Sequence, residues 1–172
     1  MDKVQLVKSV SGIALAKLTD EELLLLRTSL RVEMRKRGIA DSVGAVGEQL
    51  AIEHFRKTPG LPKLQLAPRG TKNVDALSRN GDRFSIKTIC EGSKTGTIYP
   101  ESDDRDKQLF EHILIVKLSE DWSLGAIYQL TWNEFVKARS WDKRMNAWYV
   151  AISARALGGA TRIFCSTPVN NG

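Results

Sequence analysis

An acid, a hydroxyl and a lysine stand in apolar, strand-like surroundings in the segment NVDALSRNGDRFSIKT, residues 73–88. The acid, Asp75, lies between two apolar residues, so its carboxylate points away from their side chains. Ser85 and Lys87 share one face of a second apolar segment, because side chains alternate along a strand. If Asp75 lies on that same side, the three groups converge at one place on a sheet.

These residue types could hold a metal ion and act on a phosphate. The Asp75 carboxylate beside the main-chain carbonyl of Ile86 would form a cradle of hard oxygens, which suits Mg²⁺ or Mn²⁺. The Lys87 ammonium could then stabilise charge that builds on a phosphate, or orient an attacking water. The alternative is structural: Asp75 and Lys87 could form a cross-strand ion pair, which contributes little when exposed.

Three motifs in chain order resemble the PD-(D/E)XK nuclease superfamily, the fold of many restriction enzymes and Holliday-junction resolvases. They are VGEQLA with Glu48 on a helix, NVDALS with Asp75, and FSIKT with Lys87. The resemblance is best over residues 42–88. It implies a restriction-endonuclease-like fold, a Mg²⁺ or Mn²⁺ cofactor, cleavage of DNA phosphodiesters, and these three side chains as the site.

Two positions depart from the family's pattern. Val74 replaces its proline, and Ser85 replaces its second acid, although a hydroxyl is a poorer metal ligand than a carboxylate. Glu101 could supply the missing carboxylate, but it follows a proline in a long polar segment, where fixing a ligand would cost conformational entropy. Glu48 lies on a helix among small residues and can be positioned in advance. We therefore predict that Glu48 is the second acid, that Glu101 is dispensable, and that Ser85 completes the hydrogen bonds around the site.

The chain before residue 58 has two helical patterns. Thr19 opens a capping box with Glu22, and Gly38 follows the segment as a C-cap, which predicts a helix between them. We expect its apolar residues at three- and four-residue steps to face inward: Leu23, Leu26, Leu30 and Met34. A second helix is predicted over residues 42–57. Its small residues permit close approach to a neighbouring backbone, and its inward face is Val43, Val46, Leu50, His54 and Phe55.

Strand patterns dominate after residue 58. The Asn-Gly pair in RNGD, residues 79–82, is a strong hairpin signal. Residues 91–108 have no periodicity and are predicted to be a mobile loop. The predicted strands cover residues 64–67, 74–78, 83–89, 112–118, 125–130, 147–152 and 162–165, with a short helix at 132–138.

These elements predict an α/β fold with a central mixed β-sheet flanked by helices. We expect one nuclease-like domain over residues 1–172, with an N-terminal helical segment at 1–40 and an α/β core at 41–172. No repeat or long linker interrupts the chain.

Composition and charge fit an intracellular protein with a polyanion partner. The chain has 172 residues, 42% hydrophobic and 27% charged, with a net charge of +6. No apolar run is long enough to span a membrane, and the N-terminus lacks a secretory pattern, so we expect a cytoplasmic location. Cys90 and Cys165 follow no metal or redox spacing and are expected to be free thiols.

Basic residues at several places are candidates for contacts with DNA. The groups are Arg27, Arg31 and Arg35 along the first helix, Arg69 and Lys72 before Asp75, and Lys143 and Arg144 between Trp141 and Trp148. In the same order, each group has a structural alternative: a solvated helix face, a simple loop, and a charged rim around packed tryptophans.

The sequence therefore predicts a metal-dependent DNA endonuclease, related to restriction or repair. The alternative is a nuclease-like fold without activity that binds DNA or a protein. A chain this short that cuts both strands would need to act as a homodimer.

Overall fold

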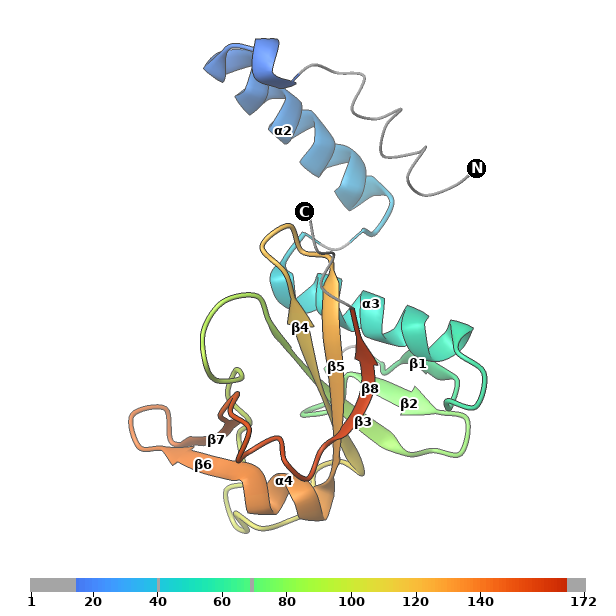
Figure 1. The fold of residues 1–172 in the computed structure, drawn as a ribbon, viewed down its shortest axis with the longest axis vertical. Helices are drawn as coiled ribbons and strands as arrows, with labels where there is room; N and C mark the ends of the chain where they lie inside the picture. Colours follow the sequence, from blue (N-terminus) through green and yellow to red (C-terminus); the bar gives the residue numbers. More distant parts are fainter. Residues whose placement is uncertain (1–14, 40, 69, 167–172) are drawn as a thin grey trace, which may run out of the picture. The chain divides into compact units, whose positions relative to one another are not determined.

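The computed structural model describes residues 15–39, 41–68 and 70–166 of the chain (Figure 1). The chain divides into two compact units, residues 1–41 and 42–172. Among the described residues, no helix is both long enough and apolar enough to cross a membrane.

In the first unit, a single 3₁₀ turn, η1 (Leu15–Lys17), precedes helix α2 (Asp20–Lys36). The predicted capping box is confirmed, because the Glu22 N–H donates to the Thr19 hydroxyl and the Glu22 carboxylate accepts from the Thr19 N–H at 2.8 Å. The predicted end of the helix is also confirmed. Gly38 has a φ of +66°, in the left-handed region that glycine adopts without strain.

The prediction that the leucine stripe of α2 faces inward is wrong for this unit. No residue of α2 is buried, and Leu23 and Leu30 are 38% and 57% exposed, while Leu26 and Met34 are half-buried. A helical stripe becomes buried only where a second element packs on it. In the described part of this unit, the only other element is the three-residue turn η1.

The second unit is built on a mixed six-stranded sheet with the order β1-β2-β3-β4-β5-β8. The pair β3–β4 is parallel and every other pair is antiparallel. The predicted α/β class with a central mixed sheet is confirmed. The strands are β1 (Leu64–Leu66), β2 (Ala76–Ser78), β3 (Arg83–Ile89), β4 (His112–Leu118), β5 (Leu124–Thr131) and β8 (Thr161–Cys165).

Two helices of this unit pack on the sheet through separate hydrophobic clusters. Helix α3 (Val43–Lys57), capped by Ser42, covers one face (Figure 1). Helix α4 (Trp132–Ala138) belongs to the cluster on the other face, through Phe135. On α3, Phe55 is fully buried as predicted, and the predicted Val43, Val46 and Leu50 are half-buried against the core, which also includes Ala51 and Ile52.

A separate two-stranded sheet consists of β6 (Arg139–Asp142) and β7 (Ala147–Val150). The sequence prediction missed β6. The prediction that all of residues 91–108 form a mobile loop is also wrong, because residues 93–98 run along β7. Thr95 N–H donates to the Val150 carbonyl at 2.9 Å and Ile98 N–H to the Trp148 carbonyl at 2.8 Å. These backbone bonds hold the segment in place without a regular period in its sequence.

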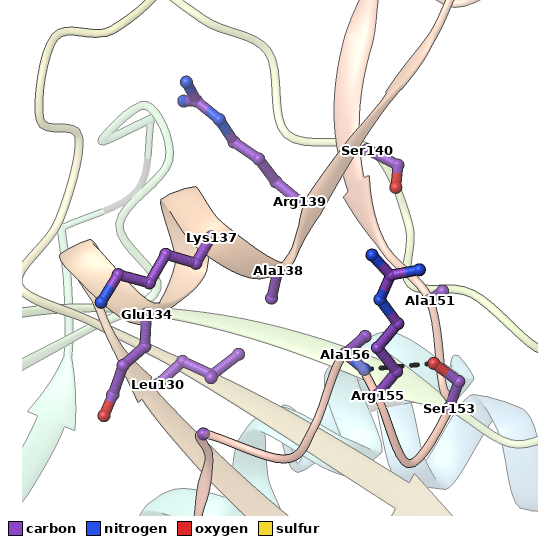
Figure 2. Close-up of a pocket in the computed structure, with 11 residues that line it drawn as sticks. Leu130, Glu134, Lys137, Ala138, Arg139, Ser140, Ala151, Ser153, Arg155 and Ala156 are labelled. Carbon is purple, nitrogen blue, oxygen red and sulfur yellow. Dashed lines mark hydrogen bonds between the residues drawn. The ribbon is translucent and has the colours of Figure 1, made fainter.

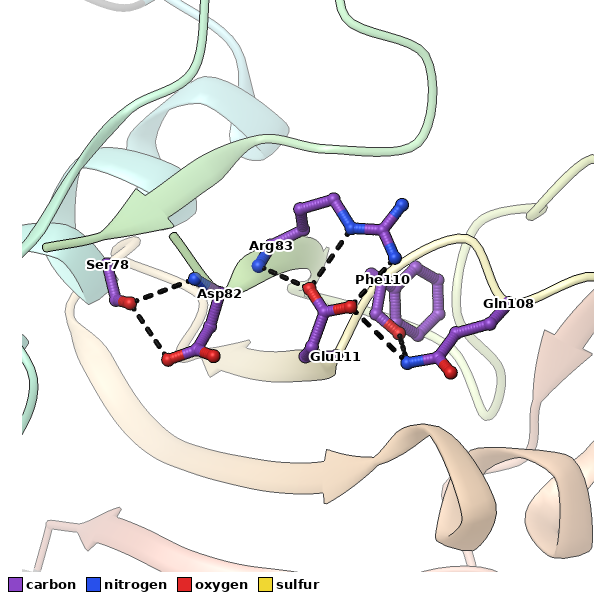
Figure 3. Close-up of polar contacts among 6 residues, drawn as sticks. All are labelled: Ser78, Asp82, Arg83, Gln108, Phe110 and Glu111. Carbon is purple, nitrogen blue, oxygen red and sulfur yellow. Dashed lines mark hydrogen bonds and ion pairs between the residues drawn. The ribbon is translucent and has the colours of Figure 1, made fainter. Parts of the chain in front are cut away.

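An ion-pair network ties the start of β3 to the start of β4 (Figure 3). The Arg83 guanidinium donates to both Glu111 carboxylate oxygens, at 2.7 and 3.0 Å, and the Arg83 N–H donates to one of them at 2.7 Å. The Glu111 N–H returns a bond to the Arg83 carbonyl at 3.0 Å. These bonds help to fix the register of the parallel pair that carries Lys87.

We expect Glu111→Gln to lower the free energy of unfolding by about 1 kcal/mol at neutral pH, because a charged, bidentate pair becomes a weaker one. Hydrogen bonds from Arg83 hold the pKa of Glu111 below its usual range. The contribution is therefore complete above the unfolded-state pKa and is lost as the pH falls through the folded-state pKa. Urea unfolding of the wild type and the variant at about pH 7 and about pH 3 checks this. The same difference in free energy of unfolding at both pH values would contradict it.

Candidate functional site

Asp75 lies immediately before β2, at the open end of the hairpin. The predicted strand over residues 74–78 is shorter in the structure, because β2 begins at Ala76. Asp75 nevertheless continues the ladder: its N–H donates to the Phe84 carbonyl at 2.8 Å, and its carbonyl accepts from the Ala67 N–H at 3.0 Å. Its carboxylate meets the Ser85 hydroxyl, so the two side chains lie on the same side of the sheet, as predicted.

The predicted hairpin turn between β2 and β3 is confirmed. The Ser78 N–H donates to the Asp82 carbonyl at 3.0 Å, and Gly81 has a φ of +88°, which favours glycine. The Ser78 hydroxyl accepts from the Asp82 N–H and donates to its carboxylate (Figure 3). This turn sets the register that places Asp75 beside the middle of β3.

The Asp75 carboxylate is anchored on β3 through one of its two oxygens. Asp75 Oδ2 accepts from the Ile86 N–H at 2.6 Å and from the Ser85 hydroxyl at 3.3 Å. Ser85 is fully buried, and this carboxylate is its hydrogen-bond partner. Ser85 therefore holds the acid in place, and Oδ1 accepts no hydrogen bond from the described residues.

The Ile86 carbonyl faces the same edge of β3 as its N–H, because in an antiparallel ladder one residue directs both groups to one neighbour. The β2 strand reaches β3 only at Phe84 and Arg83, so it does not extend to Ile86. Phe84 and Ile86 belong to the core under α3. Ser85 and the half-buried Lys87 alternate with them and face the other way, as the sequence predicts.

Glu48 on α3 interacts electrostatically with both Asp75 and Lys87. Burial raises the pKa of Glu48, the nearby Asp75 carboxylate raises it further, and Lys87 opposes the rise. The structure thus brings together the helical glutamate, the acid before β2 and the lysine of β3. All three side chains are half-buried.

A glycine lets α3 approach β3 closely enough to place Glu48 there. Gly47 is buried, and a Cβ on it would overlap the Thr88 side chain. The Thr88 hydroxyl donates to the Gly44 carbonyl at 3.2 Å, which ties the first turn of α3 to β3. The predicted close approach of α3 through small residues is therefore confirmed at these positions.

We expect Gly47→Ala to destabilise the protein by about 1–3 kcal/mol, because the added methyl must push α3 away from Thr88. The same shift would displace Glu48. Gly44→Ala is the matched control on the same helix, since a Cβ there meets nothing within 4 Å. Thermal unfolding of both variants checks this prediction, and equal stability of the two variants contradicts it.

The donor groups at this site fit a divalent cation. Two carboxylates lie close enough for Asp75 to raise the pKa of Glu48, and a cation held by both would offset this repulsion. The carbonyl of Ile86 could supply a third hard oxygen. Among the described residues, no three His, Cys, Asp or Glu side chains gather closely enough to hold a metal.

Glu101, the alternative glutamate, has a different partner. Its carboxylate forms an ion pair with Lys72 Nζ at 3.4 Å. Asn73 lies beside it and donates to the Tyr99 carbonyl at 3.2 Å. Lys72, a predicted DNA contact, is thus partly neutralised by Glu101.

The other predicted DNA contacts that the structure describes are exposed side chains. Arg27, Arg31 and Arg35 are exposed on α2, and Arg31 pairs with Asp41 at 2.6 Å. Lys143 and Arg144 are exposed in the β6–β7 turn. Arg69 lies outside the described residues.

The two tryptophans of the β6–β7 hairpin pack against each other. Their ring centroids are 4.5 Å apart, and the Arg105 guanidinium lies over Trp141 at 4.7 Å. Trp148 is half-buried and packs against the core cluster that contains Phe135, which fits the interpretation of packed tryptophans with a charged rim. Cys90 and Cys165 are free, also as predicted.

A pocket that the sequence did not predict shares no residue with the trio. It is about 630 Å³ in volume and lies between α4, β6 and the turn at residues 153–159 (Figure 2). Two of its three cations, Lys137 and Arg155, are 18 residues apart and carry no spacing signal. Only the folded chain places them around one cavity.

No known protein family matches this chain, and a comparison with curated proteins finds no relative.

Proposed function

We propose that this chain is a metal-dependent, restriction-endonuclease-like DNA endonuclease. Two observations carry the proposal: the Asp75 carboxylate is hydrogen-bonded to β3, and Glu48 interacts electrostatically with both Asp75 and Lys87. The order of the three groups, on a helix, before a strand and on the adjacent strand, matches the PD-(D/E)XK pattern. The mixed central sheet is compatible with this fold.

Each residue has a role in this proposal. Asp75 and Glu48 would hold Mg²⁺ or Mn²⁺, with the Ile86 carbonyl as a further ligand. The bound ion would stabilise negative charge on the phosphate and lower the pKa of a bound water. Lys87 would stabilise charge on the attacked phosphate or orient the attacking water. Ser85 positions Asp75 and does not touch the substrate.

A second candidate is a nuclease-like module that binds DNA or a protein without cutting. It is favoured by one observation: a buried serine stands where the family has a second acid, and the described residues contain no cluster of three acid, histidine or cysteine side chains that could hold a metal. The net charge of +6 serves DNA binding in both cases. A role in restriction or repair, and a homodimer that cuts both strands, belong to the first candidate.

One experiment separates the two candidates and identifies the substrate. The purified protein is incubated with supercoiled plasmid, linear duplex and single-stranded DNA, in Mg²⁺, in Mn²⁺ and in chelator. The endonuclease proposal expects cleavage of at least one DNA that disappears in chelator. Binding of DNA with no cleavage in either metal would favour the second candidate.

A further inference from the structure

The pocket beside α4 combines cations, hydroxyls and an apolar floor. Figure 2 shows the Arg155 side chain rising from its turn toward the Ser140 end of the pocket, with Lys137 extending from α4. The Ser153 hydroxyl accepts from the Ala156 N–H at 3.2 Å, which leaves its own hydrogen free to donate. The apolar lining is Leu130, Ala138, Ala151 and Ala156.

The pocket has an excess of positive charge. Its one acid, Glu134, is engaged by the helix cap, because its carboxylate accepts from the Thr131 N–H at 2.7 Å and from the Thr131 hydroxyl at 2.8 Å. The Arg139 guanidinium is directed away from the other lining side chains (Figure 2) and lies over the Trp148 ring at 3.9 Å. No acid pairs with Arg155 in the described part of the chain, so the N–H donors of its guanidinium are available to a ligand.

This set of donors suits a phosphate better than a carboxylate. The Arg155 guanidinium and the hydroxyls of Ser140 and Ser153 lie toward one side of the pocket, with Lys137 on the other (Figure 2). An arginine fork and two hydroxyls exceed what the two oxygens of a carboxylate use, whereas a phosphate monoester presents three strong acceptor oxygens. The apolar floor leaves room for the rest of the ligand. A volume of about 630 Å³ is within the range of small-molecule sites, roughly 300–1,000 Å³.

We propose that this pocket binds a phosphate monoester carried on a nucleotide-sized body, with Arg155 as its main anchor. A free nucleoside monophosphate and the phosphorylated end of a nucleic acid strand share this chemistry. The inference does not rest on the proposed cleavage activity, because the pocket has no residue in common with Glu48, Asp75 or Lys87.

Calorimetric titration of the full chain with deoxyadenosine monophosphate and with deoxyadenosine tests the proposal. We expect the monophosphate to bind with a Kd below about 1 mM and the nucleoside at least about tenfold more weakly. Arg155→Gln should weaken monophosphate binding at least about tenfold. Arg155 is exposed, so this variant should fold, and Arg162→Gln is the matched control, because Arg162 is an exposed arginine of β8 outside the pocket.

Two oligonucleotides that differ only in a 5′-phosphate distinguish the two sources of the phosphate. If a strand end is the ligand, the phosphorylated oligonucleotide binds more tightly to the wild type, and Arg155→Gln removes that preference. If only the free monophosphate shows Arg155-dependent binding, the ligand is a small molecule. Equal affinity for monophosphate and nucleoside, equal monophosphate binding by the Arg155 and Arg162 variants, or no binding in any arm would overturn the proposal.

Discussion

Replacing Lys87 with alanine is expected to slow DNA cleavage by at least about 100-fold while leaving Mn²⁺ binding intact. The ammonium of Lys87 interacts electrostatically with Glu48, so in the proposed site it can face a phosphate held at the metal. It is a cation and no ligand for a metal, so its loss should affect the reaction more than the binding of the ion. Cleavage rates and Mn²⁺ titrations on the same preparations provide the two measurements.

The matched control for this variant is Lys117→Ala, because Lys117 is an exposed lysine on the neighbouring strand β4. Its cleavage rate should equal that of the wild type. If Lys87→Ala also cleaved at the wild-type rate, Lys87 would have only a structural role in the sheet.

Glu48→Gln is expected to weaken Mn²⁺ binding at least about tenfold, whereas Glu101→Gln should leave it unchanged. Glu48 is positioned by the close packing of α3 on β3, while Glu101 pairs with Lys72. The raised pKa of Glu48 adds a pH signature, because the proton competes with the metal at a higher pH than for an ordinary glutamate. Calorimetric titration over a range of pH values measures both effects.

The opposite result would show that Glu48 is not the second acid. Normal Mn²⁺ binding by Glu48→Gln, together with loss of binding in Glu101→Gln, would mean that the loop glutamate supplies the second carboxylate. Such a result would require the loop to leave its Lys72 ion pair.

Local patterns predicted the elements that carry the trio. The alternation of apolar and polar residues gave β3 with its correct bounds, Arg83–Ile89, and the opposed faces of Ser85 and Ile86. The Asn-Gly pair predicted the hairpin that brings Asp75 to β3. These features depend on neighbours in the chain, so a single sequence contains the signal for them.

Other features depend on contacts between distant segments. Residues 93–98 are held by backbone bonds to β7, which leave no pattern in the side chains. The leucines of α2 show a helical period, but a period cannot say whether a second element covers them. Ser85 was predicted to complete the hydrogen bonds around the site, and its bond to Asp75 agrees with this, but the full burial of its hydroxyl depends on the fold.

The most direct test of the central claim is plasmid cleavage by the wild type and by Asp75→Ala, measured side by side in Mg²⁺ and in chelator. Asp75 links the parts of the site, because its carboxylate is hydrogen-bonded to β3 and interacts electrostatically with Glu48 on α3. The proposal predicts that the wild type cuts supercoiled plasmid only with the metal and that Asp75→Ala leaves the plasmid intact under both conditions while remaining folded. Equal cleavage by the two proteins would contradict the account, and so would a metal-loaded wild type that cuts none of the DNAs tested.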